Sequence, residues 1–172
     1  FSLGMIAGIV ATARHSIEGE RFAARRDGLT GALTRTAFVK QAETMIAAAA
    51  AQLRPLLLAY LDLDGFKRIN DDLGHEAGDR VLRCFGTEGR AALRSGDCFA
   101  RLGGDEFVVL VALHSAEAAL EAAEMLHARL TVALAAEMLA GAGITGVDPG
   151  EALRDGRAMD TWRRMIAAQG GD

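Results

Sequence analysis

Hydrophobic and polar positions fall into blocks that predict a small sheet with helices crossing between its strands. Three apolar runs have the length and composition of strands, and they cover residues 56–63, 98–102 and 106–112. Helix-forming stretches surround these runs, at about 35–52, 66–73, 77–93 and 116–139. This order favours an α+β fold of the ferredoxin-like kind, in which the runs at 98–102 and 106–112 form a hairpin.

The first apolar run is almost continuous until it ends in two carboxylates, Asp62 and Asp64. Such a run is typical of a strand that is buried on both faces and ends at a site. Because the two carboxylates are two positions apart, we expect them to share one face of that strand. The helix expected from Phe66 follows directly and carries Lys67 in its first turn. A helix N-terminus beside a lysine is a favourable phosphate site.

The heptad Arg101-Leu-Gly-Gly-Asp-Glu-Phe107 predicts a hairpin with an acidic tip. Gly103 and Gly104 can take the positive φ that a tight turn needs, and they let a ligand approach the backbone. Asp105 and Glu106 then stand at a strand end, where carboxylates can hold a divalent cation. Alone, the heptad fits an ordinary polar turn equally well. The second acidic cluster, at 62–64, favours a shared site for a metal and a phosphate.

Three motifs of this chain resemble, in order and spacing, those of the GGDEF-domain diguanylate cyclases. They are Asp27-Gly-Leu-Thr-Gly-Ala-Leu-Thr-Arg35, Asp62-Leu-Asp-Gly-Phe-Lys-Arg-Ile-Asn-Asp-Asp-Leu-Gly-His-Glu-Ala-Gly-Asp79 and the heptad at 101–107. Three motifs in register are a specific signal. The resemblance, clear from about residue 22 to 114, implies a palm-like fold similar to that of polymerases and nucleotide cyclases. It also implies condensation of two GTP molecules into cyclic di-GMP and two pyrophosphates.

The resemblance implies a metal-dependent reaction, with Mg²⁺ or Mn²⁺ as the cofactor. The 3′-hydroxyl of one GTP attacks the α-phosphorus of another, and metal ions neutralise the developing charge. Asp62, Asp105 and Glu106 are the implied carboxylate ligands, and the Leu63 carbonyl is a candidate backbone ligand. Asp105 and Glu106 are also the candidate catalytic residues. Whether either of them deprotonates the hydroxyl is left open by the sequence.

The same resemblance implies how GTP is held. Lys67 matches the family's phosphate-contacting lysine, and Phe66 anchors its helix, while Gly103 and Gly104 let the phosphates lie against the backbone. Asn70 and Asp79 match the positions that recognise guanine. A carboxylate accepts hydrogen bonds from the N1–H and the N2 amino group, which adenine does not offer in that arrangement. GTP is therefore the expected substrate.

Arg94 and Asp97 form Arg-Ser-Gly-Asp six residues before the Gly103 turn, as in the family's inhibitory product site. An arginine can bind guanine O6 and N7 in bidentate fashion, and an aspartate can accept from the other edge of the base. The alternative is a surface salt bridge at a helix end. Arg101 is a further candidate for this site, or a residue that only supports the turn.

The C-terminal part, residues 140–172, departs from the family pattern. A last strand around 143–147 is weak and rich in glycine, and residues 158–169 only loosely resemble the family's final helix. Gln169 stands where a lysine would reach the phosphates, with Arg163 or Arg164 as candidate replacements. An alternative function follows: a catalytically weak or inactive GGDEF module that acts as a cyclic di-GMP or GTP receptor or scaffold. A cyclase with a monomeric cyclic product would leave Arg-Ser-Gly-Asp without a role.

Length and charge limit the possible domain organisation and the possible partners. The 172 residues suffice for one domain, expected at 27–172, after an apolar segment and charged helical stalk at 1–26. The apolar residues 1–11 fit either the tail of a membrane helix or a helix used for dimer packing. The net charge of −4 argues against duplex nucleic acid as a partner.

Cysteine usage and the two-substrate reaction predict where and how the domain works. Cys84 and Cys98 lack metal-ligand spacing, which indicates buried thiols in a reducing cytosol. The expected location is therefore the cytoplasm, or the cytoplasmic face of the inner membrane if the full-length parent is membrane-anchored. Because each half-site of the family holds one GTP, the resemblance implies that a homodimer is needed for catalysis.

Overall fold

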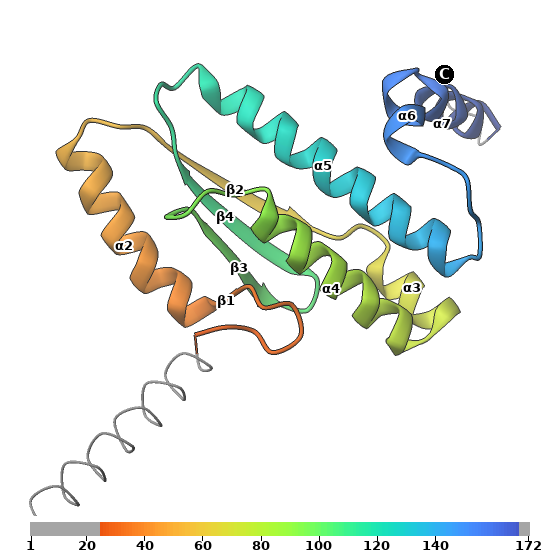
Figure 1. Ribbon diagram of the computed structural model, residues 1–172, viewed down its shortest axis with the longest axis horizontal. Helices are drawn as coiled ribbons and strands as arrows, with labels where there is room; N and C mark the ends of the chain where they lie inside the picture. The colour runs from red at the N-terminus through yellow and green to blue at the C-terminus, as the bar shows by residue number, and fades with distance from the viewer. Residues whose placement is uncertain (1–24, 169–172) are drawn as a thin grey trace, which may run out of the picture.

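A computed structural model describes residues 25–168 and consists of a mixed four-stranded sheet with helices on both faces (Figure 1). The strands are β1 (Leu33–Thr34), β2 (Leu56–Asp62), β3 (Cys98–Gly103) and β4 (Glu106–Ala112). Their order is β1-β3-β4-β2, with β1 parallel to β3 and the other neighbours antiparallel. The helices are α2 (Arg35–Ala51), α3 (Phe66–Leu73), α4 (His75–Ala91), α5 (Ala118–Gly141), α6 (Pro149–Arg154) and α7 (Arg157–Ala168). The predicted α+β fold is confirmed.

Two hydrophobic clusters, one on each face of the sheet, hold these layers together. On one face, α4 and α5 cover a cluster around three aromatic rings, with the Phe85 and Phe107 ring centroids 4.6 Å apart and those of Phe99 and Phe107 5.4 Å apart. On the other face, α2 packs on Cys98, which is fully buried, and on its neighbours in β3 and β4. Successive strand residues alternate between the two clusters, as the pleat requires.

The predicted helices are all present, and α2 shows why a departure from the family pattern is tolerated. Thr34 stands where the resemblance leads one to expect Asn, and it is the N-cap residue of α2. Its hydroxyl accepts a hydrogen bond from the Ala37 N–H at 3.4 Å. Threonine and asparagine can both satisfy a free N–H in this position, so the substitution keeps the helix start.

The expectation that β2 is buried on both faces is wrong. Leu58 and Tyr60 are 63% and 58% exposed, because α2 packs over β1, β3 and part of β4 and leaves this face of β2 uncovered. The strand also lies at the edge of the sheet. An apolar run alone does not tell how many neighbouring elements a strand has.

The expected last strand around 143–147 is not formed either. Gly143 and Gly146 have φ values of +72° and +77°, in the left-handed region, which an extended strand excludes. Ile144 and Val147 are about half exposed in this loop. Within residues 25–168, the outer edge of β2 therefore has no partner strand. The chain continues into α6, which contacts both α5 and α7, and then into α7, which packs on α6 (Figure 1).

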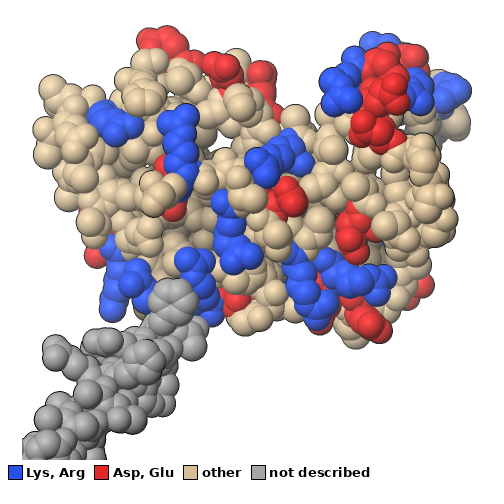
Figure 2. Space-filling model, in the orientation of Figure 1, with Lys and Arg blue, Asp and Glu red and all other residues tan. Residues whose placement is uncertain are grey.

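Charge is distributed without a large patch of one sign on the face drawn in Figure 2. Basic and acidic side chains are interspersed there, including at the end formed by α6 and α7. The predicted segment at 1–11, most of the stalk at 12–26 and Gln169 lie outside the described residues. Among residues 25–168, no helix combines the length and the apolar character needed to cross a bilayer.

Candidate nucleotide and metal site

The carboxylates singled out in the sequence gather where β2 ends and β4 begins. Asp62 is the last residue of β2 and lies opposite Glu106, the first residue of β4, in the antiparallel register. Partial desolvation, followed by the negative charges of Asp105, Asp64 and Glu106, raises the pKa of Asp62 above its ordinary value. The strand ends at Asp62, so Asp64 lies in the following turn and does not share a strand face with it. These four side chains form what we call the acidic edge.

The acidic edge has the right ligand atoms for a divalent cation, although its side chains are not oriented around one common point. No three His, Cys, Asp or Glu side chains within residues 25–168 are arranged as a ready metal site. The donors are carboxylate oxygens, which hard cations such as Mg²⁺ and Mn²⁺ prefer. A bound cation would also offset the repulsion that raises the pKa of Asp62.

The turn between β2 and α3 presents a backbone carbonyl and a helix N-terminus beside the acidic edge. Gly65 takes φ +75°, and the Phe66 N–H donates to the Leu63 carbonyl at 3.1 Å. A carbonyl oxygen has a second lone pair, so Leu63 can still bind a ligand there. Lys67 is exposed in the first turn of α3 and forms no ion pair with any described residue. Its ammonium group is free to contact a phosphate.

The packing of α3 on α4 places the Asn70 side chain of α3 against the start of α4, next to Asp79. Gly78 makes this possible, because a Cβ at that position would overlap the Asn70 side-chain oxygen and crowd the Phe66 ring. Asp79 is half-buried and forms an ion pair with Arg83 at 3.6 Å, one turn later on α4. A guanine base at Asp79 would therefore compete with Arg83 for the carboxylate.

The turn at Gly103 and Gly104 is open on its outer side. Gly104 takes φ +54°, and no heavy atom lies within 4 Å of the position that a Cβ would occupy on either glycine. The register of β3 and β4 shifts between Arg101 and Gly103, which bends the strand just before the acidic residues. The backbone at this turn is accessible to a ligand.

Arg101 supports this turn, which was one of the two roles considered for it. Its Nε donates to the Gly104 carbonyl at 2.8 Å, and its Nη1 donates to the Asp27 carboxylate at 3.1 Å. Burial acts to raise the pKa of Asp27, but hydrogen bonds from Thr30 and Arg101 outweigh it and hold the pKa below its ordinary value. Asp27 belongs to a motif that the sequence singled out, although its contact with the hairpin could not be foreseen.

Tyr60 is a neighbour of the acidic edge that sequence reasoning missed. The Glu106 carboxylate lies near its hydroxyl, and the interaction with this carboxylate, aided by partial desolvation, raises the pKa of Tyr60 above its ordinary value. Tyr60 stands two residues before Asp62 on β2, so strand periodicity places both on the same face. The two-residue spacing between Tyr60 and Asp62 was the signal in the sequence that could have identified Tyr60.

Arg94 and Asp97 form a compact turn directly before β3. The Arg94 N–H donates to the Asp97 carboxylate at 3.0 Å, and the Asp97 N–H donates to the Arg94 carbonyl at 3.1 Å. Within residues 25–168 no ion pair joins their side chains. The alternative, a surface salt bridge between Arg94 and Asp97, is therefore not formed. The Arg94 guanidinium is left available for another partner.

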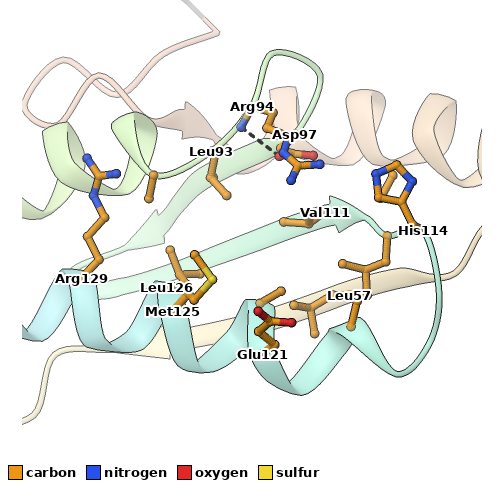
Figure 3. Close-up of a pocket in the computed structure, with 15 residues that line it drawn as sticks. Leu57, Leu93, Arg94, Asp97, Val111, His114, Glu121, Met125, Leu126 and Arg129 are labelled. Carbon is orange, nitrogen blue, oxygen red and sulfur yellow. Dashed lines mark hydrogen bonds between the residues drawn. The ribbon is translucent and has the colours of Figure 1, made fainter.

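This turn stands at the rim of a hollow of about 330 Å³ between α5 and the sheet (Figure 3). Leu57 and Val111 of the sheet and Leu126 of α5 line the apolar part. Other members of the rim, His114, Glu121 and Arg129, were not singled out in the sequence. His114 follows β4, and Glu121 and Arg129 both lie on α5, so no local spacing could have connected them with Arg94.

Residues 24–146 match the sequence model of the family described as "Diguanylate cyclase, GGDEF domain". The chain belongs to the GGDEF family. The predicted family is thereby confirmed over the greater part of the chain. The match ends within the loop after α5, where the expected last strand is not formed.

Proteins named for two different activities are similar to this chain. Diguanylate cyclase DgcP of Pseudomonas aeruginosa is 43% identical over 153 residues, covering 83% of this chain and 22% of that protein. Cyclic di-GMP phosphodiesterase NbdA of the same organism is 42% identical over 99 residues, covering 58% of this chain and 13% of that protein. The chain thus spans less than a quarter of the length of both relatives.

Solved GGDEF structures share the fold. The coiled coil and GGDEF domain of DgcB from Caulobacter crescentus, in complex with c-di-GMP, matches with a TM-score of 0.67 at 30% identity. The match covers 72% of this chain and 65% of that one. Diguanylate cyclase SiaD from Pseudomonas aeruginosa, in complex with its activator SiaC, matches with a TM-score of 0.58 at 28% identity, over 74% of this chain and 50% of that one.

Proposed function

We propose that this GGDEF domain is a diguanylate cyclase, which condenses two GTP molecules into cyclic di-GMP and two pyrophosphates. The observation that carries the proposal is the acidic edge. Asp62 and Glu106 face each other across two strands, with Asp105 beside them. The open Gly104 turn and the free Lys67 at the start of α3 flank these carboxylates. A triphosphate with its cation needs this combination of groups.

In this proposal Asp62, Asp105, Glu106 and the Leu63 carbonyl hold Mg²⁺ or Mn²⁺. The cation, when bound, supplies neutralisation of the triphosphate charge and of the departing pyrophosphate. Lys67 and the N–H groups at the start of α3 bind phosphate oxygens. The absence of side chains at Gly103 and Gly104 lets the phosphates lie against the backbone.

The protein's other contribution is selection and orientation of the nucleotide. Asp79 accepts from the guanine N1–H and N2 amino group once Arg83 has moved aside, and Asn70 satisfies a further polar atom of the base or ribose. The 3′-hydroxyl of each GTP then attacks the α-phosphorus of the other, and the bond to pyrophosphate breaks. Asp105 and Glu106 are the candidates to accept the hydroxyl proton. Two domains must face each other, so the active form is a homodimer.

We further propose that cyclic di-GMP inhibits the domain through Arg94 and Asp97. The free Arg94 guanidinium can bind guanine O6 and N7. One Asp97 oxygen accepts from the Arg94 N–H, which leaves the other oxygen for the base.

The proposed setting is the cytoplasm, or the cytoplasmic face of the membrane in a longer parent protein. The proposed domain covers residues 27–172, preceded by a signalling stalk.

A second candidate function is a receptor that binds cyclic di-GMP or GTP without turnover. The observation that favours it is the C-terminal part, in which residues 143–147 form a loop, so that β2 has no outer partner strand within residues 25–168, and α7 packs mainly on α6. A phosphate contact from this part of the chain would then be missing. NbdA, a relative with a matching segment, is named for phosphodiesterase activity.

One experiment separates the two candidates. The purified chain is incubated with GTP and Mg²⁺, the products are resolved by chromatography, and cyclic di-GMP is titrated separately by calorimetry. Formation of cyclic di-GMP establishes the cyclase. Tight cyclic di-GMP binding with no product, even after two copies are fused to enforce dimerisation, establishes the receptor.

A further inference from the structure

Arg35 is an exposed cationic side chain next to the glycine turn, and it forms no ion pair within residues 25–168. It follows β1 directly and is the first residue of α2 (Figure 1). β1 runs parallel to β3, with Thr34 opposite Arg101. The next position places Arg35 beside Leu102, and its Nη2 donates to the Leu102 carbonyl at 3.5 Å. A guanidinium has five N–H donors, so most donors of Arg35 remain available.

Two side chains of the acidic edge lie on the same face of the sheet as α2. Glu106 and Val108 are two positions apart on β4, and Val108 belongs to the hydrophobic cluster under α2. Asp62 is opposite Glu106 in the register and therefore shares this face. Tyr60 shares it as well, and while Glu106 raises the pKa of Tyr60, the positive charge of Arg35 acts to lower it. Arg35 is thus an electrostatic neighbour of the acidic edge.

Lys67 lies on the opposite side of the acidic edge. It belongs to α3, which packs on α4, and Leu63 and Phe66 beside it join the hydrophobic cluster on the α4–α5 face. The acidic edge therefore has a lysine on the α4–α5 side and an arginine on the α2 side. A triphosphate that carries one divalent cation keeps a net negative charge, and two cationic side chains can bind its oxygens from both sides.

The arginines considered as phosphate contacts from the C-terminal part are bonded within their own helix. Arg163 donates to the Asp160 carboxylate at 3.3 Å, and Arg164 donates to the Thr161 hydroxyl at 3.0 Å. Their helix, α7, packs on α6. Arg35, in contrast, stands beside the turn and the carboxylates of the proposed site.

We propose that Arg35 binds phosphate oxygens of the nucleotide held at the acidic edge, from the side opposite to Lys67. This inference rests on the proposed function and names a further substrate-binding residue for it. In that function the phosphates lie against the Gly103–Gly104 backbone, which begins one residue after the carbonyl that Arg35 contacts. The planar fork of a guanidinium matches the geometry of a phosphate group. Arg35 thereby supplies a contact that α7 does not make.

The kinetic test compares Arg35→Gln and Arg35→Lys, with Lys40→Gln as the matched control. Glutamine can still donate to the Leu102 carbonyl but has no charge, whereas lysine keeps the charge. Lys40 is exposed on the same helix, five positions later and therefore on another face of it.

We expect KM for GTP of Arg35→Gln to rise about ten- to a hundredfold, the effect of losing one charge-assisted hydrogen bond. Arg35→Lys should raise KM less than about fivefold, because the charge remains without the fork. Lys40→Gln should behave like the wild type. An unchanged KM in Arg35→Gln, or an equal rise in Lys40→Gln, would overturn the proposal.

Binding of inorganic triphosphate in the presence of Mg²⁺ provides a measurement that does not depend on turnover. In calorimetry we expect the Kd of Arg35→Gln to be about ten- to a hundredfold higher than that of the wild type, with Lys40→Gln unchanged. Equal binding by wild type and Arg35→Gln, or binding by neither, would overturn the contact. If the wild-type chain makes no cyclic di-GMP, the proposed function fails, yet this titration still decides whether Arg35 binds phosphate.

Discussion

At the scale of single residues, the acidic edge has a cost that a bound cation would remove. Asp62 is exposed, and its pKa is raised by partial desolvation and by three neighbouring carboxylates. Folding therefore gains nothing from the charge of Asp62 near neutral pH. A group that is unfavourable for folding and surrounded by like charges is a candidate for function.

Replacement of single carboxylates should separate activity from stability. We expect Asp62→Asn and Asp105→Asn to abolish cyclic di-GMP formation, because each removes a proposed cation ligand. The thermal midpoint of Asp62→Asn should stay the same or rise, since repulsion is relieved. Chromatography and a thermal melt measure the two effects. Normal activity in either variant would contradict the metal assignment.

Cys98 should make stability depend on pH in the alkaline range. Burial, with a smaller effect of Asp97, raises the pKa of its thiol from 9.0 to about 11. Between these two pKa values the folded state keeps the thiol neutral, while the thiol of the unfolded chain ionises. The contribution of Cys98 to the free energy of unfolding is therefore complete below pH 9 and is lost as the pH rises toward about 11. Urea unfolding across this range should show a steeper loss for wild type than for Cys98→Ala. Parallel curves would show that the thiol is not the cause.

At the scale of elements, the sequence was informative where local pattern decides the structure. The helix expected at 66–73 is α3, Phe66–Leu73, and the hairpin strands agree to within a residue. Burial of β2 was predicted wrongly, because it depends on which elements lie beside the strand. Similarly, the motif residues were found from spacing, whereas the contact of Arg101 with Asp27 joins segments 74 positions apart.

Close approach of two elements at Gly86 gives a prediction for stability. We expect Gly86→Ala to cost about 1–3 kcal/mol in the free energy of unfolding, because the added methyl group overlaps Thr30 and the loop that carries Thr30 must shift. Gly141→Ala is the control, since only the end of the flexible Arg80 side chain lies near that position. Chemical denaturation measures both. Equal stability of the two variants would contradict the tight contact between α4 and the loop.

At the scale of the whole molecule, the two proposed nucleotide sites lie at opposite ends of β3. The Arg94–Asp97 turn precedes Cys98, and the glycine turn begins at Gly103. Six extended residues span about 20 Å. Cyclic di-GMP at Arg94 therefore cannot displace GTP phosphates in the same domain. In the proposed function, inhibition therefore acts on how two domains face each other and not on phosphate binding.

This separation predicts that inhibition and catalysis can be changed independently. We expect Arg94→Ala to relieve inhibition by added cyclic di-GMP and to leave the initial rate as in the wild type, because the acidic edge is untouched. Initial rates measured across a series of cyclic di-GMP concentrations provide the test, with Arg157→Lys as a surface control. Unaltered inhibition in Arg94→Ala would place the product elsewhere.

The uncovered β2 has a consequence for how the isolated chain behaves at high concentration. Among the described residues 25–168, no strand pairs with its outer edge, which therefore offers backbone donors and acceptors along an apolar strand, with Leu58 and Tyr60 exposed beside it. Such an edge is a template for intermolecular strand pairing. A lysine at the solvent-facing Leu58 should act as a gatekeeper, so Leu58→Lys should scatter less light than wild type on concentration and melt at a similar temperature. Colloidal stability of this domain would then be decided by a single exposed strand.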